Sequence, residues 1–408
     1  MSQSTERPPP ADSTGSLVSR PSLAAVIGQT AGGLLVPVLA VVTAVVVGGL
    51  IIWLTGSGPP PEYITLTWPP FLVNTGLWRP ILAYMGLIQG AIGSPEAIAE
   101  TTVWAVPYIF AGLAVALAFK GGLFNIGAQG QFMMGALGSV IIGVQLRESP
   151  AVVAIPAALA MGMLFGAAWG FIPGFLKATS GAHEVVTTIM LNFIALAILA
   201  AAVNGPLNVE GSASPITPDV GNASLPILFG TNGHIGIIYA PLMALLYGFL
   251  LFRTTRGFEI RIAGSSPDAA RYAGMSPKRL IIWTMTAAGL LAGMAGATDL
   301  LGTTHQMSSS YSTTVGFDAI AVALLGRTNP LGIVLAALLF GALRTGSAAM
   351  QIQAGVPAEL VGVLQATILF FLVASPVIKR IFRLKGARTG LEETTTFTST
   401  YGGEATIR

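Results

Sequence analysis

The chain alternates between long apolar runs and short polar segments. A bilayer core of about 30 Å needs roughly 20 apolar residues in one helix. Runs without a charged residue approach or exceed this length at 31–54, 101–119, 124–146, 151–176 and 360–378. Transmembrane β-strands would read as segments of about ten alternating residues, unlike these continuous runs. The pattern therefore predicts an all-α integral membrane protein.

About ten segments are interpreted as transmembrane helices. They cover residues 31–54, 102–119, 124–146, 151–175, 186–204, 235–252, 280–300, 315–326, 330–349 and 358–378. The eighth is short enough to be broken or re-entrant. Residues 80–93 are interpreted as an extracytoplasmic or interfacial helix, because an additional crossing there would spoil the charge asymmetry of the loops.

Composition and charge agree with this interpretation and set the orientation. Hydrophobic residues make up 53% of the chain and charged residues 9%, whereas soluble domains carry roughly a quarter charged residues. With the N-terminus in the cytoplasm, 17 of the 20 Lys and Arg lie on the cytoplasmic side; Arg79 and Arg147 face outward and Arg344 lies within a span. Cytoplasmic loops are enriched in basic residues, so both termini are predicted to be cytoplasmic. The net charge of +3 then needs no nucleic acid to explain it.

The same pattern divides the chain into a transmembrane domain and two tails. Residues 1–30 are expected to be a disordered cytoplasmic tail, and residues 379–408 a basic, partly disordered one. The transmembrane domain, 31–378, carries a cytoplasmic loop at 253–279 and extracytoplasmic loops at 55–101 and 205–234.

Small residues recur every four positions in the fourth predicted span. They are Ala154, Ala158, Gly162, Gly166, Gly170 and Gly174. The seventh span repeats the spacing with Gly289, Gly293 and Ala297. Such a ridge lets two helix backbones approach closely, so we expect tight helix packing here.

The sequence lacks the usual motifs of energy conversion and catalysis. No G-x-x-x-x-G-K-[ST] phosphate loop and no H-E-x-x-H motif occurs, cysteine is absent, and the three histidines are scattered. We therefore expect neither an intrinsic ATPase nor an intramembrane enzyme, and no catalytic residue, cofactor or metal. An ion-coupled secondary transporter would usually need an ion-binding carboxylate at mid-membrane, for which Asp318 alone hardly suffices.

The loop 253–279 contains a short, bounded helix. Ser266 is a good N-cap, Pro267 suits the first helical position, Asp268 favours the helix dipole, and Gly274 suits the end. Between them lie Ala269, Ala270, Arg271, Tyr272 and Ala273. An ordinary interfacial helix is one interpretation. The functional interpretation is a coupling helix whose small side chains enter a cleft of an ATPase.

Four stretches resemble a known transporter family. They are GLFNIGAQGQ at 122–131, EVVTTIMLN at 184–192, AARYAGM at 269–275 and GFDAIAVALLG at 316–326. This resembles the permeases of bacterial ABC importers for nucleosides and simple sugars, in order over roughly 102–375. The family usually has Glu where Gln129 stands and often Asn where His183 stands.

The resemblance implies a type II ABC importer permease bundle in the bacterial inner membrane. It also implies ABC ATPase subunits, a second permease forming a homo- or heterodimer, and an extracytoplasmic substrate-binding lipoprotein. The transported solute would be a nucleoside or a simple sugar. The related permeases for branched-chain amino acids are the alternative within the class.

Polar residues at membrane depth are costly and mark the expected translocation path. The candidates are Asn125, Gln129, Gln131, Thr188, Asn192, Asp318 and Gln351. In a continuous helix Asn125 and Gln129 would share a face, while Gln131 would point toward the side of Gly127 and Gly135. Each of these residues could instead connect neighbouring helices by hydrogen bonds.

Overall fold

The computed structural model describes residues 23–56, 62–209, 211–311, 313–374, 377 and 382. Nearly all of this part is helical. The α-helices are α1 (Leu23–Thr55), α2 (Glu62–Thr67), α3 (Pro70–Thr75), α4 (Trp78–Ile92), α5 (Pro95–Lys120), α6 (Ala128–Gln145), α7 (Ala151–Ser180), α8 (Glu184–Asn204), α9 (Gly236–Arg253), α10 (Thr255–Ser265), α11 (Pro267–Tyr272), α12 (Pro277–Asp299), α13 (Val315–Leu325), α14 (Pro330–Ala354) and α15 (Leu360–Val373). Short strands β1 (Ile227–Phe229) and β2 (Gly233–His234) pair antiparallel, η1 (Gly221–Ala223) is a 3-10 turn, and η2 (Leu300–Thr304) is a π-helical turn.

The helices bear out an all-α membrane protein. Within the described residues, seven helices are long and apolar enough to cross a membrane: α1, α5, α7, α8, α9, α12 and α14. The apolar helices α13 and α15 are shorter, as expected for α13. Every one of the ten predicted segments contains a helix. How many of them cross the membrane stays a prediction.

Two boundaries differ from the prediction. α1 begins at Leu23, so residues 23–30 continue the helix instead of belonging to a disordered tail, because the apolar, helix-compatible sequence starts there. α6 begins at Ala128, later than the predicted start at 124. The rest of the N-terminal tail and nearly all of 379–408 lie outside the described residues.

Local sequence explains where several helices begin and end. The Ser94 side chain accepts a hydrogen bond from the backbone nitrogen of Ala97 at 3.1 Å and caps α5, with Pro95 in the first turn. Asn329 and Pro330 start α14 in the same way. Gly355 ends α14 in the left-handed conformation, with φ of 63°.

The core is centred on α5. In its apolar window 89% of the residues are buried, compared with 22% for α7 and for α8. α5 packs against α12, α13, α14 and α9. The outer helices expose large apolar side chains such as Leu164, Phe193 and Phe249. Such a surface suits contact with lipid, because it offers nothing that water would hydrate.

The small-residue ridges of α7 and α12 pack against each other, which agrees with the tight packing predicted for both helices. Ala154, Ala158, Gly162, Gly166, Gly170 and Gly174 are all buried on α7. A Cβ atom added to Gly166 would lie 2.8 Å from the backbone nitrogen of Gly293 on α12, and one added to Gly170 would lie 2.9 Å from the Cα of Gly289. The backbones of α7 and α12 are therefore in direct contact.

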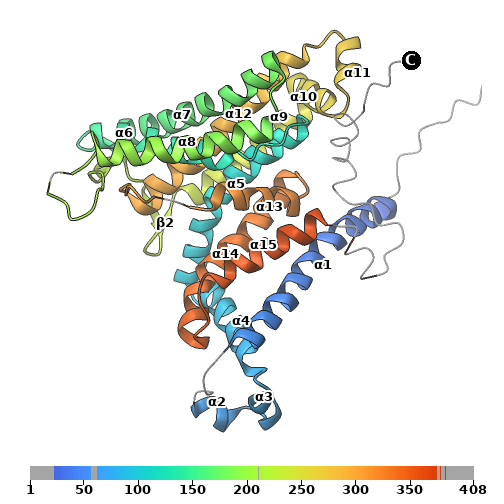
Figure 1. Ribbon diagram of the computed structural model, residues 1–408, viewed down its shortest axis with the longest axis vertical. Coiled ribbons are helices and arrows are strands. Elements are labelled where there is room, and N and C mark those ends of the chain that lie inside the picture. The colour runs from blue at the N-terminus through green and yellow to red at the C-terminus, as the bar shows by residue number, and fades with distance from the viewer. Residues whose placement is uncertain are drawn as a thin grey trace, which may run out of the picture.

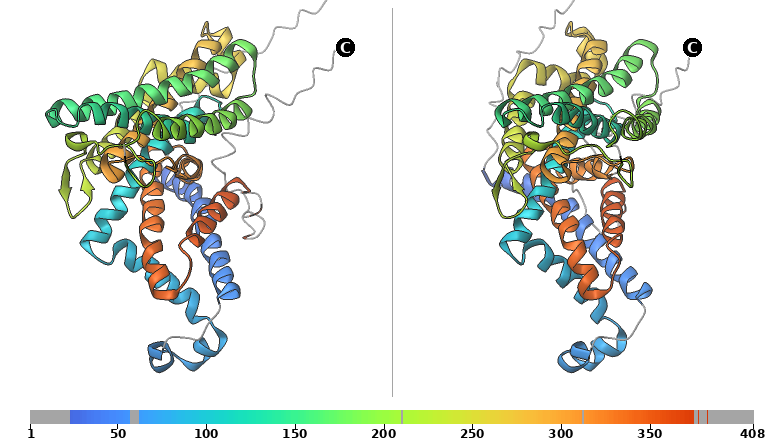
Figure 2. Two further views of the ribbon diagram at one scale, coloured as in Figure 1. Left: turned by 60° about the vertical axis from the view of Figure 1, so that its left-hand side comes forward. Right: turned by 90° about the vertical axis from the view of Figure 1, so that its left-hand side faces the viewer.

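The two ends of the molecule carry different elements (Figure 1). The helices α10 and α11 of the loop 253–279 lie at one end, and α2 and α3 at the opposite end, in all views (Figure 2). One lobe contains α6, α7, α8 and α12, and a second contains α1, α4, α14 and α15. The extra helix α4, predicted at 80–93, packs along α14.

Candidate functional site

The segment 121–127 connects α5 to α6 without being helical. Gly122 adopts a left-handed conformation with φ of 72°, which favours glycine. A Cβ atom on Gly122 would lie 2.9 Å from the Cα of Gly264. Gly122 therefore allows α10, from the loop 253–279, to pack directly against this segment.

Asn125 and Gln131 form a reciprocal amide pair. Asn125 Nδ2 donates to Gln131 Oε1 at 2.9 Å, and Gln131 Nε2 donates to Asn125 Oδ1 at 3.2 Å. Both residues are buried. The expected helical face shared by Asn125 and Gln129 is wrong, because α6 starts only at Ala128 and the turn before it directs Asn125 toward Gln131.

Gln129 connects α6 to the beginning of α13. Its Nε2 donates to the carbonyl oxygen of Thr313 at 2.5 Å, and its Oε1 accepts from the backbone nitrogen of Gly316 at 2.9 Å. Gln129 is 3% exposed, so its amide forms hydrogen bonds with the backbone at the start of α13 instead of with water.

Asn192 connects α8 to the same segment by hydrogen bonds, and Thr188 packs against this segment at Gly127. Asn192 Oδ1 accepts from the backbone nitrogen of Gly130 at 2.8 Å, and its Nδ2 donates to the carbonyl of Ile126 at 3.1 Å. The hydroxyl of buried Thr188 donates to the carbonyl of Val185 at 3.1 Å. The structure thus gathers five of the seven predicted path residues into one buried cluster around the start of α6: Asn125, Gln129, Gln131, Thr188 and Asn192.

Asp318 and Gln351 lie apart from that cluster. Asp318, half-buried in the first turn of α13, accepts hydrogen bonds at Oδ2 from Thr314 Oγ1 at 2.7 Å and from Tyr108 OH at 3.3 Å. Gln351 is exposed near the end of α14, and no hydrogen bond within the described residues joins its side chain to the other six.

The helix predicted in the loop 253–279 is present as α11. The Ser266 hydroxyl accepts from the backbone nitrogen of Ala269 at 3.3 Å, and Pro267 occupies the first turn. Gly274 is left-handed with φ of 78°, and the backbone nitrogen of Met275 donates to the carbonyl of Ala270. This is a glycine-terminated helix end. The loop also contains α10, which the sequence interpretation did not include.

One expectation about α11 has to be corrected. Ala270 was expected to face a partner, but its side chain is completely buried inside this chain. The exposed side of α11 consists instead of Asp268, Ala269, Arg271, Tyr272 and Ala273. Tyr272 is 94% exposed, so the surface available to a partner has an aromatic residue on it.

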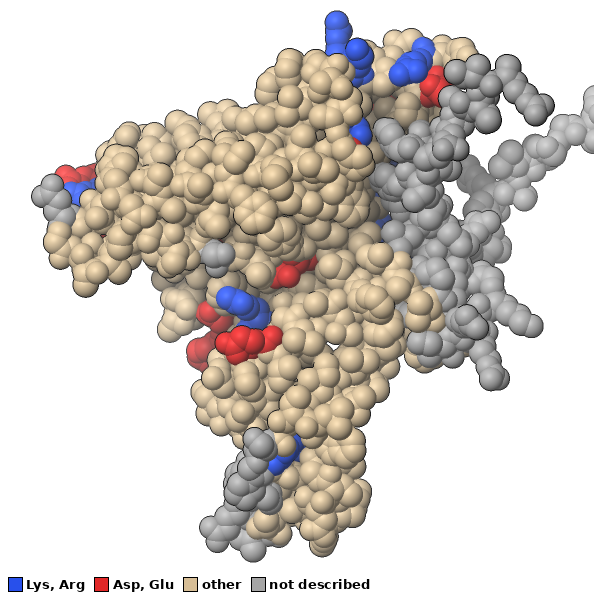
Figure 3. Space-filling view, in the orientation of Figure 1, with Lys and Arg blue, Asp and Glu red and all other residues tan. Residues whose placement is uncertain are grey.

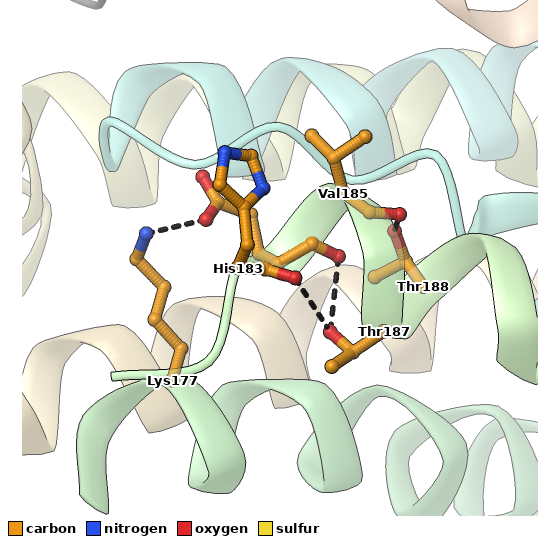
Figure 4. Close-up of polar contacts among 6 residues, drawn as sticks. Lys177, His183, Val185, Thr187 and Thr188 are labelled. Carbon is orange, nitrogen blue, oxygen red and sulfur yellow. Dashed lines mark hydrogen bonds and ion pairs between the residues drawn. The ribbon is translucent and has the colours of Figure 1, made fainter. Parts of the chain in front are cut away.

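A cavity of about 800 Å³ lies beside α11. It is lined by the ends of α5 and α7, by α10 and α11, and by the start of α12. Lys177, at its edge, forms an ion pair of 2.5 Å with Glu184, and the two side chains are only 9% and 10% exposed (Figure 4). The turn between α7 and α8 and the helix α11 therefore border the same cavity.

Comparison with known proteins identifies the family. Residues 97–373 match the model described as "Branched-chain amino acid transport system / permease component". The chain belongs to this family. The permease is 37% identical to the guanosine ABC transporter permease protein NupP of Bacillus subtilis over 87% of this chain and 98% of that protein. It is 38% identical to the nucleoside ABC transporter permease protein NupB of Lactococcus lactis (74% and 86%) and 33% identical to the glucose ABC transporter permease protein TsgB13 of Haloferax volcanii (74% and 82%). No solved structure matches it significantly.

The resemblance seen in the sequence is therefore confirmed. The chain is the permease subunit of an ABC importer, a multi-pass protein of the bacterial inner membrane. Its family implies ATPase and substrate-binding partners. Like its relatives, it is a transport subunit.

The sequence interpretation left several polar residues near Asp318 out of the site. Tyr108 donates to its carboxylate, and Arg344 stacks over the ring of Trp104 with 5.0 Å between the guanidinium carbon and the ring centroid. Arg344 could have been found from the sequence, because an arginine inside an apolar span is itself a functional signal. Tyr108 gave no such signal among its apolar neighbours.

Proposed function

We propose that this permease imports a nucleoside by alternating access, using ATP hydrolysed by partner subunits. The two relatives named for guanosine and nucleoside transport are 37% and 38% identical across most of the chain. A simple sugar is the second candidate, favoured by the relative named for glucose at 33%. Our proposal includes an ABC ATPase, a second permease and an extracytoplasmic lipoprotein as partners.

The observation that carries the proposal is the exposed α11 in the cytoplasmic loop. A helix held by a capped start and a glycine end presents Tyr272 and four neighbours outward. Aromatic residues are enriched among those that dominate protein interfaces. We infer that this surface, defined by Asp268, Ala269, Arg271, Tyr272 and Ala273, docks on the ATPase.

A continuous set of contacts leads from this surface to the candidate path. α11 follows α10 directly, and Gly264 of α10 packs on Gly122. The segment after Gly122 enters α6, where Gln129 holds the start of α13, and α13 carries Asp318. We infer that movement of α11 reaches Asp318 by this route, so the buried amides position the path rather than touching the solute.

The experiment is uptake in proteoliposomes. The permease is purified with its ATPase, its permease partner and its lipoprotein and reconstituted into liposomes. Labelled guanosine should be transported only when ATP is present on the side of the membrane that carries the ATPase. Ionophores that dissipate proton and sodium gradients should leave uptake unchanged. Uptake driven by an ion gradient in the absence of the ATPase would contradict the proposal.

A further inference from the structure

Arg344 occupies an unusual position for a charged residue. It is the fifteenth of the 25 residues of α14, which places it about 20 Å from the start and 15 Å from the end of that helix. Its side chain is exposed on the surface of the chain. A charge near the middle of a span costs roughly 2.5–3.5 kcal/mol on insertion scales, and arginine cannot escape this cost by losing its proton.

The described part of the chain does not neutralise this guanidinium by a close contact. No carboxylate there lies within 4.0 Å of it. Its contact is the stacking over Trp104, whose indole nitrogen donates to Glu100 Oε1 at 2.9 Å. Arg344 and Asp318 contact residues that lie one helical turn apart on α5, Trp104 and Tyr108 respectively, so the two charged residues face the same part of that helix.

Lipid does not suit this position. In the predicted orientation α14 runs outward from the basic loop at Arg327, and helix side chains lean toward the N-terminus of their helix. Arg344 therefore lies in the outer half of this span, where its guanidinium is placed over the ring of Trp104. Figure 3 shows a mixed group of basic and acidic side chains in a hollow between the two lobes, while the surrounding surface is almost free of charge.

Arg344 and Asp318 offer a solute one set of hydrogen-bond donors and one acceptor. The guanidinium of Arg344, placed over the Trp104 ring, offers N–H donors in a flat fork. Asp318 receives both of its hydroxyl hydrogen bonds on Oδ2, so Oδ1 can still accept from a solute. A site with a flat double donor and a carboxylate acceptor matches a molecule with two adjacent acceptors and a pair of hydroxyls.

We propose that Arg344 and Asp318 form a solute-contact site for 6-oxopurine nucleosides in the outer half of the translocation path. The O6 and N7 atoms of guanine accept both donors of an arginine, and the same two atoms are present in inosine. The ribose hydroxyls donate to Asp318. Adenosine presents an amino donor in place of O6, and therefore cannot satisfy the same fork. This inference rests on the nucleoside importer function proposed above.

The test compares maximal uptake rates in proteoliposomes containing the complete importer. The lipoprotein is saturated with guanosine, inosine or adenosine in turn, so that its own selectivity does not enter. We expect wild-type rates for guanosine and inosine at least about fivefold above that for adenosine, the lower end of the discrimination by an arginine fork. Arg344→Gln and Arg344→Lys should both lose this preference, because lysine keeps the charge but not the fork.

A second variant tests the carboxylate separately. In the wild type, 2′,3′-dideoxyguanosine should be transported several-fold more slowly than guanosine, and in Asp318→Asn this difference should shrink. Arg147→Gln is the matched control, since Arg147 is exposed outside the spans and pairs with exposed Glu148. This control should keep wild-type rates and preference. Abundance and co-purification with the ATPase show that each variant assembles.

The outcomes separate this inference from the function on which it rests. Wild-type uptake of leucine instead of nucleosides would overturn both. Wild-type uptake of all three nucleosides at equal rates, or an Arg344→Gln importer with unchanged rate and preference, would overturn the site and leave the nucleoside importer standing.

Discussion

Gln129 of α6 and Gly316 of α13 are joined by a buried hydrogen bond of 2.9 Å from the glycine backbone nitrogen to the amide oxygen. The same amide donates to the carbonyl of Thr313. One side chain thereby satisfies a donor and an acceptor at the start of a short membrane helix. A backbone group without such a partner would be costly in a water-free environment.

Removing this amide should destabilise the permease. Gln129→Leu has a similar size but leaves the Gly316 nitrogen and the Thr313 carbonyl unpaired, at a cost of about 1–3 kcal/mol for each group left buried and unsatisfied. Thermal unfolding in detergent should show a clearly lower Tm. Gln351→Leu is the control, because Gln351 is exposed. Equal Tm values for the two variants would contradict the role given to Gln129.

The neighbouring alanines of α11 should respond in opposite ways to the same substitution. Ala270 is fully buried and Ala269 is exposed. Ala270→Trp overpacks the interior and should lower abundance. Ala269→Trp should keep normal abundance but weaken co-purification with the ATPase, because its bulk lies on the docking surface. If Ala269→Trp retains the ATPase and full transport, the docking surface lies elsewhere, with the turn from Lys177 to Glu184 as the next candidate.

The orientation can be tested by cysteine labelling, since the native chain has no cysteine. Cysteines at Asn222 and Ser310, both exposed, should react with an impermeant thiol reagent from outside intact cells. A cysteine at exposed Ser265 should react only after permeabilisation. Labelling of Ser265 from outside would reverse the orientation inferred from the basic residues.

The glycine contact between α7 and α12 should tolerate no added bulk. Gly166→Val would place side-chain atoms against the backbone of Gly289 and Gly293, forcing the helices apart. We expect strongly reduced abundance in the membrane. Gly362→Val, also in a helix but with open space around its Cβ position, should accumulate normally. Similar losses for both variants would point to helix propensity and not to packing.

His234 should make stability depend on pH. It lies in β2, outside the spans, where burial and then the nearby His305 lower the pKa of His234 from 6.5 to about 4. The unfolded chain therefore binds more protons than the folded one between these values. Stability should be complete above pH 6.5 and fall toward pH 4, by about 3 kcal/mol at most.

The measurement is Tm between pH 7.5 and pH 4 for the purified permease. His234→Gln should flatten the decrease, whatever its effect at neutral pH. His183→Gln, at an exposed position before α8, should follow the wild type. A wild-type Tm independent of pH over this range would refute the prediction.

The sequence was sufficient for those features that depend on local pattern. Apolar length located the long helices, and Ser266, Pro267 and Gly274 outlined α11. The four-residue spacing from Ala154 to Gly174 predicted a close helix contact, but not that its partner would be α12. Each of these follows from residues close together in the chain.

The features that were missed depend on tertiary contacts. A face shared by Asn125 and Gln129 requires a helix through residues 125–129. In the structure Gly122 packs against Gly264 from a distant loop, and α6 starts only at Ala128. Ala270 is buried in a helix that packs against both α10 and α12, and α10 was not predicted. The pairing of Tyr108 with Asp318 spans 210 positions, beyond any local pattern.

The direct backbone contact between α7 and α12 has a mechanical consequence. Glycine and alanine have no side-chain torsions that could change to absorb a shift of one helix along the other. The two helices should therefore tilt together as a stiff lever. α12 starts at Pro277, just after α11, and its 23 residues reach about 35 Å toward the opposite side of the membrane. A displacement of α11 would then move the C-terminal end of α12, because the paired helices deform little between the two ends.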